Sequence, residues 1–173
     1  MKEGRLDAAK EKLKELQSLI ARAPNLGDDD KQWTGYWAGL FASEIQLAEG
    51  FPERAVEAFQ RVQRFGWYDL WATNAAVAYN SPFLKDVAAR AYVKMGEIGK
   101  AIAEYERLTA FDPKRPERRL IHPLYYYRLA KLHDQKGQKA KARARYERFL
   151  ELWKDADPGQ AEVDDAKVRL AAL

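Results

Sequence analysis

The sequence predicts an all-α protein that reuses one helical unit, and three observations support this prediction. A glycine is followed five residues later by an alanine at Gly4/Ala9, Gly50/Ala55, Gly96/Ala101 and Gly137/Ala142. Each pair precedes an amphipathic run, and the successive glycines are 46, 46 and 41 residues apart. No stretch alternates between apolar and polar residues as a β-strand does. We therefore expect a single all-α domain, 1–173, in which one helical unit is repeated as in a solenoid.

The first part of the chain is expected to supply a half repeat and then a full repeat. Residues 3–22 carry apolar side chains at spacings of three and four, which predicts an amphipathic helix. The acidic run 28–30 is expected to cap the next helix, which Gly50 ends. Pro52 suits the first turn of the partner helix. These signals predict a half repeat at 3–22 and a repeat at 29–65.

The second part is expected to continue the array with longer connections. Ser81-Pro82 is a typical helix start, and the three prolines between 113 and 123 exclude a helix there. The segment 66–80 is either a short helix or a packed loop. The expected segments are an insert at 66–80, a repeat at 82–112, a connector at 113–122, a repeat at 123–154 and a capping helix at 159–172.

Composition excludes several classes of protein. No apolar stretch approaches the ~20 residues that cross a bilayer, and the N-terminus lacks the apolar core of a signal peptide. The absence of cysteine excludes disulfides and thiolate metal sites, and a cytoplasmic location is compatible with it. The net charge of +4 is a small difference between 30 basic and 26 acidic side chains. The basic segments 114–119 and 136–148 contain intervening acids or alanines, so they resemble solvated surfaces more than a nucleic-acid footprint.

Catalytic and metal-binding patterns are not found. The only histidines, His122 and His133, are 11 residues apart, unlike the pairs of helical zinc sites, and both suit structural positions. Gly96-Glu97-Ile98-Gly99 lacks the lysine of a phosphate-binding loop, and no nucleophile has a neighbouring base. The acids at 28–30 and 164–165 suit helix termini better than a cation site. We expect no enzyme, no cofactor and no metal.

The repeated residues resemble those of tetratricopeptide repeats, over nearly the whole chain. The third unit fits this pattern through Ala89, Tyr92, Gly96, Ala101, Tyr105 and Pro113. The fourth unit fits it through Leu129, Ala130, Gly137, Ala142 and Tyr146, with His133 where tyrosine is usual. The second unit fits it through Gly50, Ala55 and Phe59, but Ser43 and Gln46 replace a small residue and an aromatic one. Small residues let paired helices approach closely, and the family's unit of about 34 residues is shorter than the units here.

This resemblance implies a right-handed solenoid of antiparallel helix pairs, with long inserts between repeats and a C-terminal capping helix. It also implies a surface for a partner. In the family the first helix of each unit lines the concave face, and position-by-position transfer gives Trp37, Leu40, Glu44, Phe83, Asp86, Arg90, Leu124, Tyr127, Lys131 and Asp134. The alternative is that Trp37, Leu40 and Leu124 are simply buried. Consecutive residues are about 100° apart on a helix, so Tyr125, Tyr126 and Tyr127 cannot all face the core. Tyr127 is expected to lie at the surface or in the groove, with a solvated hydroxyl. The family's clamp for a terminal carboxylate is not reproduced.

The expected function is therefore a scaffold that binds a protein or peptide segment, or docks other domains of its own polypeptide. The stretch 122–173 resembles the end of tetratricopeptide regions in large bacterial multidomain proteins. One alternative is homo-oligomerisation through the unpaired helix at 3–22, whose stripe includes Leu6, Leu13 and Ile20. A second alternative, less favoured, is a helical array that binds nucleic acid through its basic segments.

Overall fold

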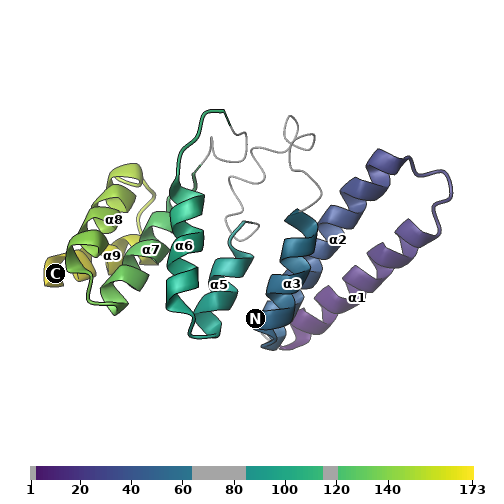
Figure 1. Cartoon of the computed structure of the whole chain (residues 1–173), viewed down its shortest axis with the longest axis horizontal. Helices are drawn as coiled ribbons and strands as arrows, with labels where there is room; N and C mark the ends of the chain where they lie inside the picture. Colours follow the sequence, from purple (N-terminus) through teal and green to yellow (C-terminus); the bar gives the residue numbers. More distant parts are fainter. Residues whose placement is uncertain (1–2, 64–84, 115–120) are drawn as a thin grey trace.

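The computed structural model describes residues 3–63, 85–114 and 121–173 (Figure 1). Within these residues the chain forms helices and no strand, which confirms the predicted all-α class. The helices are α1 (Glu3–Ala21), α2 (Asp28–Glu49), α3 (Pro52–Gln63), α5 (Val87–Lys94), α6 (Ile98–Thr109), α7 (Leu124–Gln135), α8 (Lys139–Leu152) and α9 (Ala161–Ala172). The predictions for 66–80, for Ser81-Pro82 and for Phe83 lie outside the described residues.

The helices pack in chain order, each against its neighbour in the sequence. α2 pairs with α3, α5 with α6, and α7 with α8, and these pairs stack through α3 on α5 and α6 on α7. α2 also contacts α5, the first helix of the next pair, and α7 contacts the final helix α9. Figure 1 shows the resulting row, from α1 at the right to α9 at the left. The sequence prediction of stacked helix pairs is confirmed.

The repeated glycines form the turns within the pairs. Gly50, Gly96 and Gly137 have φ angles of 89°, 74° and 69°, a region that side chains with a Cβ avoid. In each turn the residue after the glycine donates its N–H to the carbonyl five residues back, at 2.9 Å: Phe51 to Gln46, Glu97 to Tyr92, and Gln138 to His133. This bond satisfies a carbonyl that the helix end leaves without a partner. The same turn has therefore been used three times in the described chain.

The repeated alanines lie where the helices cross. Ala55, Ala101 and Ala142 are 0% exposed, each within the first turns of the second helix of its pair. A methyl group at this position lets the two backbones approach within the usual ~8–10 Å of packed helices. A larger side chain would have to displace a core that is already filled. The predicted role of these alanines in close packing is consistent with their complete burial.

Two details differ from the sequence predictions. Gly4 lies inside α1 and Ala9 is only half-buried, so the first glycine–alanine pair does not form this turn. The cap of α2 is Gly27, because Asp28 is already helical, and no side chain bonds to the exposed N–H groups.

The helix α7 is buried on several sides, which corrects the prediction for its three tyrosines. Tyr125, Tyr126 and Tyr127 are 1%, 8% and 8% exposed. Tyr125 packs against Tyr105 of α6 with ring centroids 6.2 Å apart, and Tyr127 packs against Phe149 of α8 at 5.3 Å. Tyr126 donates its hydroxyl to the Thr109 carbonyl at the end of α6, at 3.5 Å, so neighbouring helices cover all three tyrosines. None of the three presents a freely solvated hydroxyl, contrary to the expectation for Tyr127.

Candidate partner-binding groove

A cavity opens on the face formed by α2, α5 and α7, which we call the groove face. Its volume is about 490 Å³. Four helices line it: α2 with Glu44, Leu47 and Ala48; α5 with Arg90, Val93 and Lys94; α6 with Tyr105; and α7 with Tyr127, Arg128, Lys131 and Leu132. The lining combines aliphatic and aromatic surface with charged heads. This is the usual composition of a binding cavity, which is mostly apolar with a few placed polar groups.

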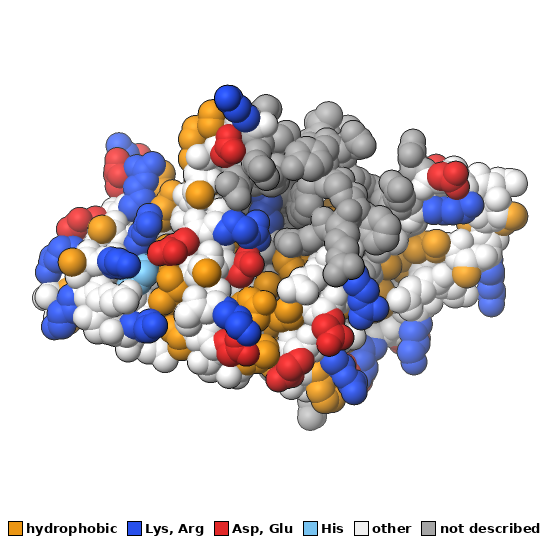
Figure 2. Space-filling view, viewed as in Figure 1, with side chains coloured by type: hydrophobic (Ala, Val, Ile, Leu, Met, Phe, Trp, Pro, Cys, Tyr) orange, Lys and Arg blue, Asp and Glu red, His pale blue; other side chains and the backbone are white. Residues whose placement is uncertain are grey.

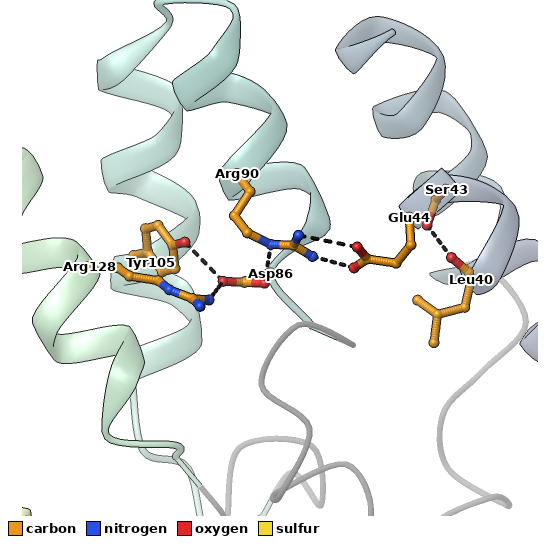
Figure 3. Close-up of polar contacts among 7 residues, drawn as sticks. All are labelled: Leu40, Ser43, Glu44, Asp86, Arg90, Tyr105 and Arg128. Carbon is orange, nitrogen blue, oxygen red and sulfur yellow. Dashed lines mark hydrogen bonds and ion pairs between the residues drawn. The ribbon is translucent and has the colours of Figure 1, made fainter. Parts of the chain in front are cut away.

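A chain of charged side chains crosses the groove face from α2 to α7 (Figure 3). Asp86 lies at its centre and is 0% exposed. Its carboxylate accepts hydrogen bonds from Arg90 Nε at 2.8 Å, from the Tyr105 hydroxyl at 2.9 Å and from Arg128. Arg90 continues the chain by donating through both terminal nitrogens to the Glu44 carboxylate, at 3.2 Å in one of these bonds. The network therefore joins α2, α5, α6 and α7.

Burial and neighbouring charges oppose each other in the pKa values of Glu44 and Arg90 but act together in the pKa of Tyr105. Burial raises the pKa of Glu44 by more than its bonds to Arg90 lower it. Burial also acts to lower the pKa of Arg90, but Asp86 and Glu44 outweigh it, so this pKa is raised. Burial, with the Asp86 charge added, raises the pKa of Tyr105. Removing such groups from water is costly, so the network contributes fixed geometry more than net stability.

A second polar cluster lies where α7 meets α9. The Tyr127 hydroxyl donates to Asp165 at 2.7 Å, and Lys131 Nζ donates to the same hydroxyl oxygen at 3.3 Å. Arg169 binds Asp165 through Nε at 2.7 Å and Asp134 through Nη1 at 3.3 Å. Burial acts to raise the pKa of Asp165, but the bonds from Tyr127 and Arg169 lower it overall. The helix α9 therefore closes this end of the groove face.

The structure separates the predicted partner-binding residues into three groups. Glu44, Arg90, Tyr127 and Lys131 line the same cavity, although they come from three helix pairs. Leu40 and Asp86 are 0% exposed, so neither is available to a partner: Leu40 belongs to the core between α2, α3 and α5, and Asp86 is surrounded by its three donors. Trp37 and Leu124 are partly buried against core clusters, and Asp134 is bound by Arg169.

Several cavity residues were missed by the sequence reasoning. Leu47 and Val93 lie one turn beyond the predicted Glu44 and Arg90, at the same distance from Gly50 and Gly96. Extending the positional transfer by one turn would have found them. Arg128 has no such signal, because its inward position depends on its bond to Asp86, 42 residues away.

The two histidines have structural environments. His133 is 1% exposed, and its Nδ1 lies 2.7 Å from Gln138 Oε1 across the turn. His122 Nδ1 accepts the Leu124 N–H at 3.2 Å, which requires the neutral ring. Burial and Arg128 lower the pKa of His122 to about 4, with Asp86 opposing this and Lys85 adding to it. The His122 ring also packs edge-on against Trp153, with centroids 6.1 Å apart.

Other functional surfaces have weaker support. In the described part of the chain, no group of three or more acids and histidines could hold a metal ion. The helices described here include none with the length and apolar character to span a membrane.

The basic surface considered for nucleic acid is mixed in charge. On α8, Lys139, Lys141 and Arg143 are exposed, but Arg148 pairs with Glu151 at 2.6 Å. Charges of both signs are interspersed on the face that Figure 2 shows. Most of the basic segment 114–119 lies outside the described residues.

Comparison with known proteins finds a family match for part of the chain. Residues 87–115 and 124–153 match the family described as tetratricopeptide repeat. The chain contains tetratricopeptide repeats. The two matched segments correspond to the pairs α5–α6 and α7–α8. No curated protein and no solved structure significantly matches the chain.

The pair α2–α3 lies outside the matched residues but has the same construction as the two tetratricopeptide repeats. It has the left-handed Gly50 turn and the fully buried Ala55. Ser43, which replaces the small residue expected in its first helix, is 0% exposed and donates its hydroxyl to the Leu40 carbonyl at 2.6 Å. A hydroxyl satisfied within its own helix costs little when buried, so serine fits this position. Tetratricopeptide repeats in general bind protein partners, and no specific partner is identified.

Proposed function

We propose that this protein is a non-catalytic scaffold that binds a polypeptide segment on the groove face. The observation that supports this proposal is the cavity of about 490 Å³ shared by three successive first helices. A cavity of this size accepts several side chains of a peptide, which would extend across more than one repeat. The absence of cysteine is compatible with a cytoplasmic site of action.

The lining of the cavity suits a peptide better than a small metabolite. Tyr105 and Leu132 form part of its floor and are 2% and 6% exposed, whereas Val93 is 39% exposed at its rim. Apolar surface at the floor and rim provides contact area, and the charged heads between them provide orientation. An arginine fixed by two carboxylates, as Arg90 is, loses little freedom when a partner binds.

Site-specific photo-crosslinking tests the proposal. A photoreactive amino acid replaces Val93 at the rim of the cavity, and the matched control replaces Arg143, which is exposed on α8. We expect the Val93 probe to crosslink to one reproducible polypeptide segment, and a synthetic peptide of that segment to compete. If the segment belongs to the full-length protein itself, the groove docks its own polypeptide. Equal crosslinking from both positions would contradict the proposal.

Self-association through α1 is a second candidate, favoured by the weak burial of this helix. None of the α1 side chains described in the structure is buried, and Leu19 is 61% exposed. The stripe that includes Leu6, Leu13 and Ile20 is only partly covered by α2. Sedimentation equilibrium over a wide concentration range tests this candidate. A mass that rises with concentration in the wild type but not in Leu19→Lys would support it, and a constant monomer mass would exclude it.

A further inference from the structure

The groove cavity contains more cationic than anionic side chains. Arg90, Lys94, Arg128 and Lys131 line it, whereas Glu44 is the only carboxylate among the described residues of its lining. The buried Asp86 below the lining adds one further negative charge. At the α9 end, Asp134 and Asp165 are both bound by Arg169. The cavity itself therefore carries an excess of positive charge, although the protein as a whole has nearly balanced charges.

The two arginines of the cavity form ion pairs within the protein, whereas the two lysines form none among the described residues, although Lys131 acts electrostatically on the more distant Asp165. Arg90 pairs with Glu44 and Asp86, and Arg128 pairs with Asp86. Lys94 Nζ instead donates to the Leu47 carbonyl oxygen at 2.8 Å. Lys131 Nζ donates to the Tyr127 hydroxyl and stands 5.2 Å from the centre of its ring. Among the described residues, no carboxylate lies within ion-pair distance of either lysine.

Apolar side chains line the same cavity as the two lysines. Val93 precedes Lys94 on α5, and Leu132 follows Lys131 on α7, and both line the same cavity. On the α2 side, Leu47 and Ala48 extend this surface. A ligand with only negative charge would leave these apolar groups exposed to water. A ligand with only apolar groups would cover the lysines without providing counterions, at a desolvation cost.

We propose that the groove selects an acidic, amphipathic peptide segment, in which internal Asp or Glu side chains pair with Lys94 and Lys131 and an aliphatic or aromatic side chain enters the cavity between them. This inference rests on the proposed function and specifies its partner by chemistry. We assign the carboxylates to side chains within the segment, and the test below blocks the peptide C-terminus so that a terminal carboxylate cannot contribute. Opposite charges at the partly exposed rim determine which sequences bind and how fast.

Selection from a displayed library of random peptides of about 12 residues, long enough to span the helices in extended form, tests the inference. The full chain is the target, and the peptide C-terminus is covalently blocked by the display linkage. Three proteins are compared: the wild type, Lys94→Glu/Lys131→Glu, and the control Lys139→Glu/Lys141→Glu, which makes the same charge change on α8. Far-UV circular dichroism verifies that each protein is folded.

We expect peptides enriched on the wild type to contain more Asp and Glu than the input library, together with apolar residues. The dissociation constant of the best peptide should rise at least about tenfold for the groove variant and less than about twofold for the control. Changing the Asp and Glu residues of the best peptide to Asn and Gln should weaken its binding to the wild type by a similar factor. Binding to the wild type should also weaken as ionic strength rises, which tests the inference even if the groove variant misfolds.

The contradicting outcomes are distinct. Peptides that depend on the groove but show no acidic enrichment would overturn the inference and leave the proposed function standing. No groove-dependent peptide at all would count against both. If a single-stranded oligonucleotide competes as well as the acidic peptide, the lysines bind polyanions without discrimination. This result would overturn the assignment to a peptide.

Discussion

Changing Asp86 to asparagine removes the central charge of the network while keeping the shape of the side chain. The new amide would present an N–H₂ group toward donors, so at least one of the bonds from Arg90, Tyr105 and Arg128 would be lost. Breaking a fully buried ion pair typically costs about 3–5 kcal/mol. The side chains of Arg90 and Arg128 are 27% and 30% exposed, so water would recover part of this cost. We expect a loss of about 2–3 kcal/mol.

Urea unfolding at neutral pH, followed by far-UV circular dichroism, measures this loss. For a chain of this size the same change corresponds to a melting temperature lower by about 4–12 °C. The control is Glu151→Gln, which removes an exposed partner of Arg148 and should cost less than about 1 kcal/mol. If Asp86→Asn costs no more than this control, the buried carboxylate does not hold the arginines in place, and the network has been misinterpreted.

Three further predictions concern other parts of the fold. Because the pKa of His122 is lowered to about 4 in the folded protein, the unfolded chain binds more protons between pH 6.5 and 4. The wild type should therefore lose stability relative to His122→Gln as pH falls through this range, by at most about 1.4 kcal/mol per pH unit. If the urea midpoints of the two proteins change equally with pH, this prediction is wrong. A Cβ at Gly39 would lie 2.5 Å from Val62 Cγ2, so Gly39→Ala should destabilise the protein by about 1–3 kcal/mol. In a Val62→Ala background the same change should instead stabilise it by up to about 1 kcal/mol, and equal effects in both backgrounds would exclude the clash. Backbone amides of α1 should exchange with solvent faster than those of α7, because α1 has no buried described side chain, and equal protection in hydrogen exchange would show otherwise.

The fold was predictable because its signals are local and repeated. Gly50, Gly96 and Gly137 each mark a turn, and each is followed by an alanine that allows close packing. Where one local signal stood alone, the prediction was less accurate. Gly4 shares the spacing of the other glycines but lies within a helix. The acids at 28–30 suit a helix cap, but the helix begins at the first of them, after Gly27.

The candidate groove was predictable only in part, because side-chain exposure depends on contacts that sequence does not contain. Position in the repeat predicted Glu44, Arg90 and Lys131, and all three line one cavity. The same reasoning failed for Asp86, whose burial depends on Arg128 and Tyr105 in other helices. For Tyr127 the helical geometry was sound, but α9 covers a side of α7 that a pattern within one helix cannot reveal. The part of a binding surface that depends on neighbouring repeats requires the assembled structure.

The charged network also affects how the array unfolds. It runs from Glu44 through Arg90 and Asp86 to Arg128. Repeat arrays normally melt piecemeal from their ends, since each unit is held mainly by its immediate neighbour. Here, unfolding any one of the helix pairs α2–α3, α5–α6 and α7–α8 would leave a buried charge of the adjacent pair without its partner. Unfolding one pair therefore destabilises the next. The central pairs should consequently open together, as one cooperative block.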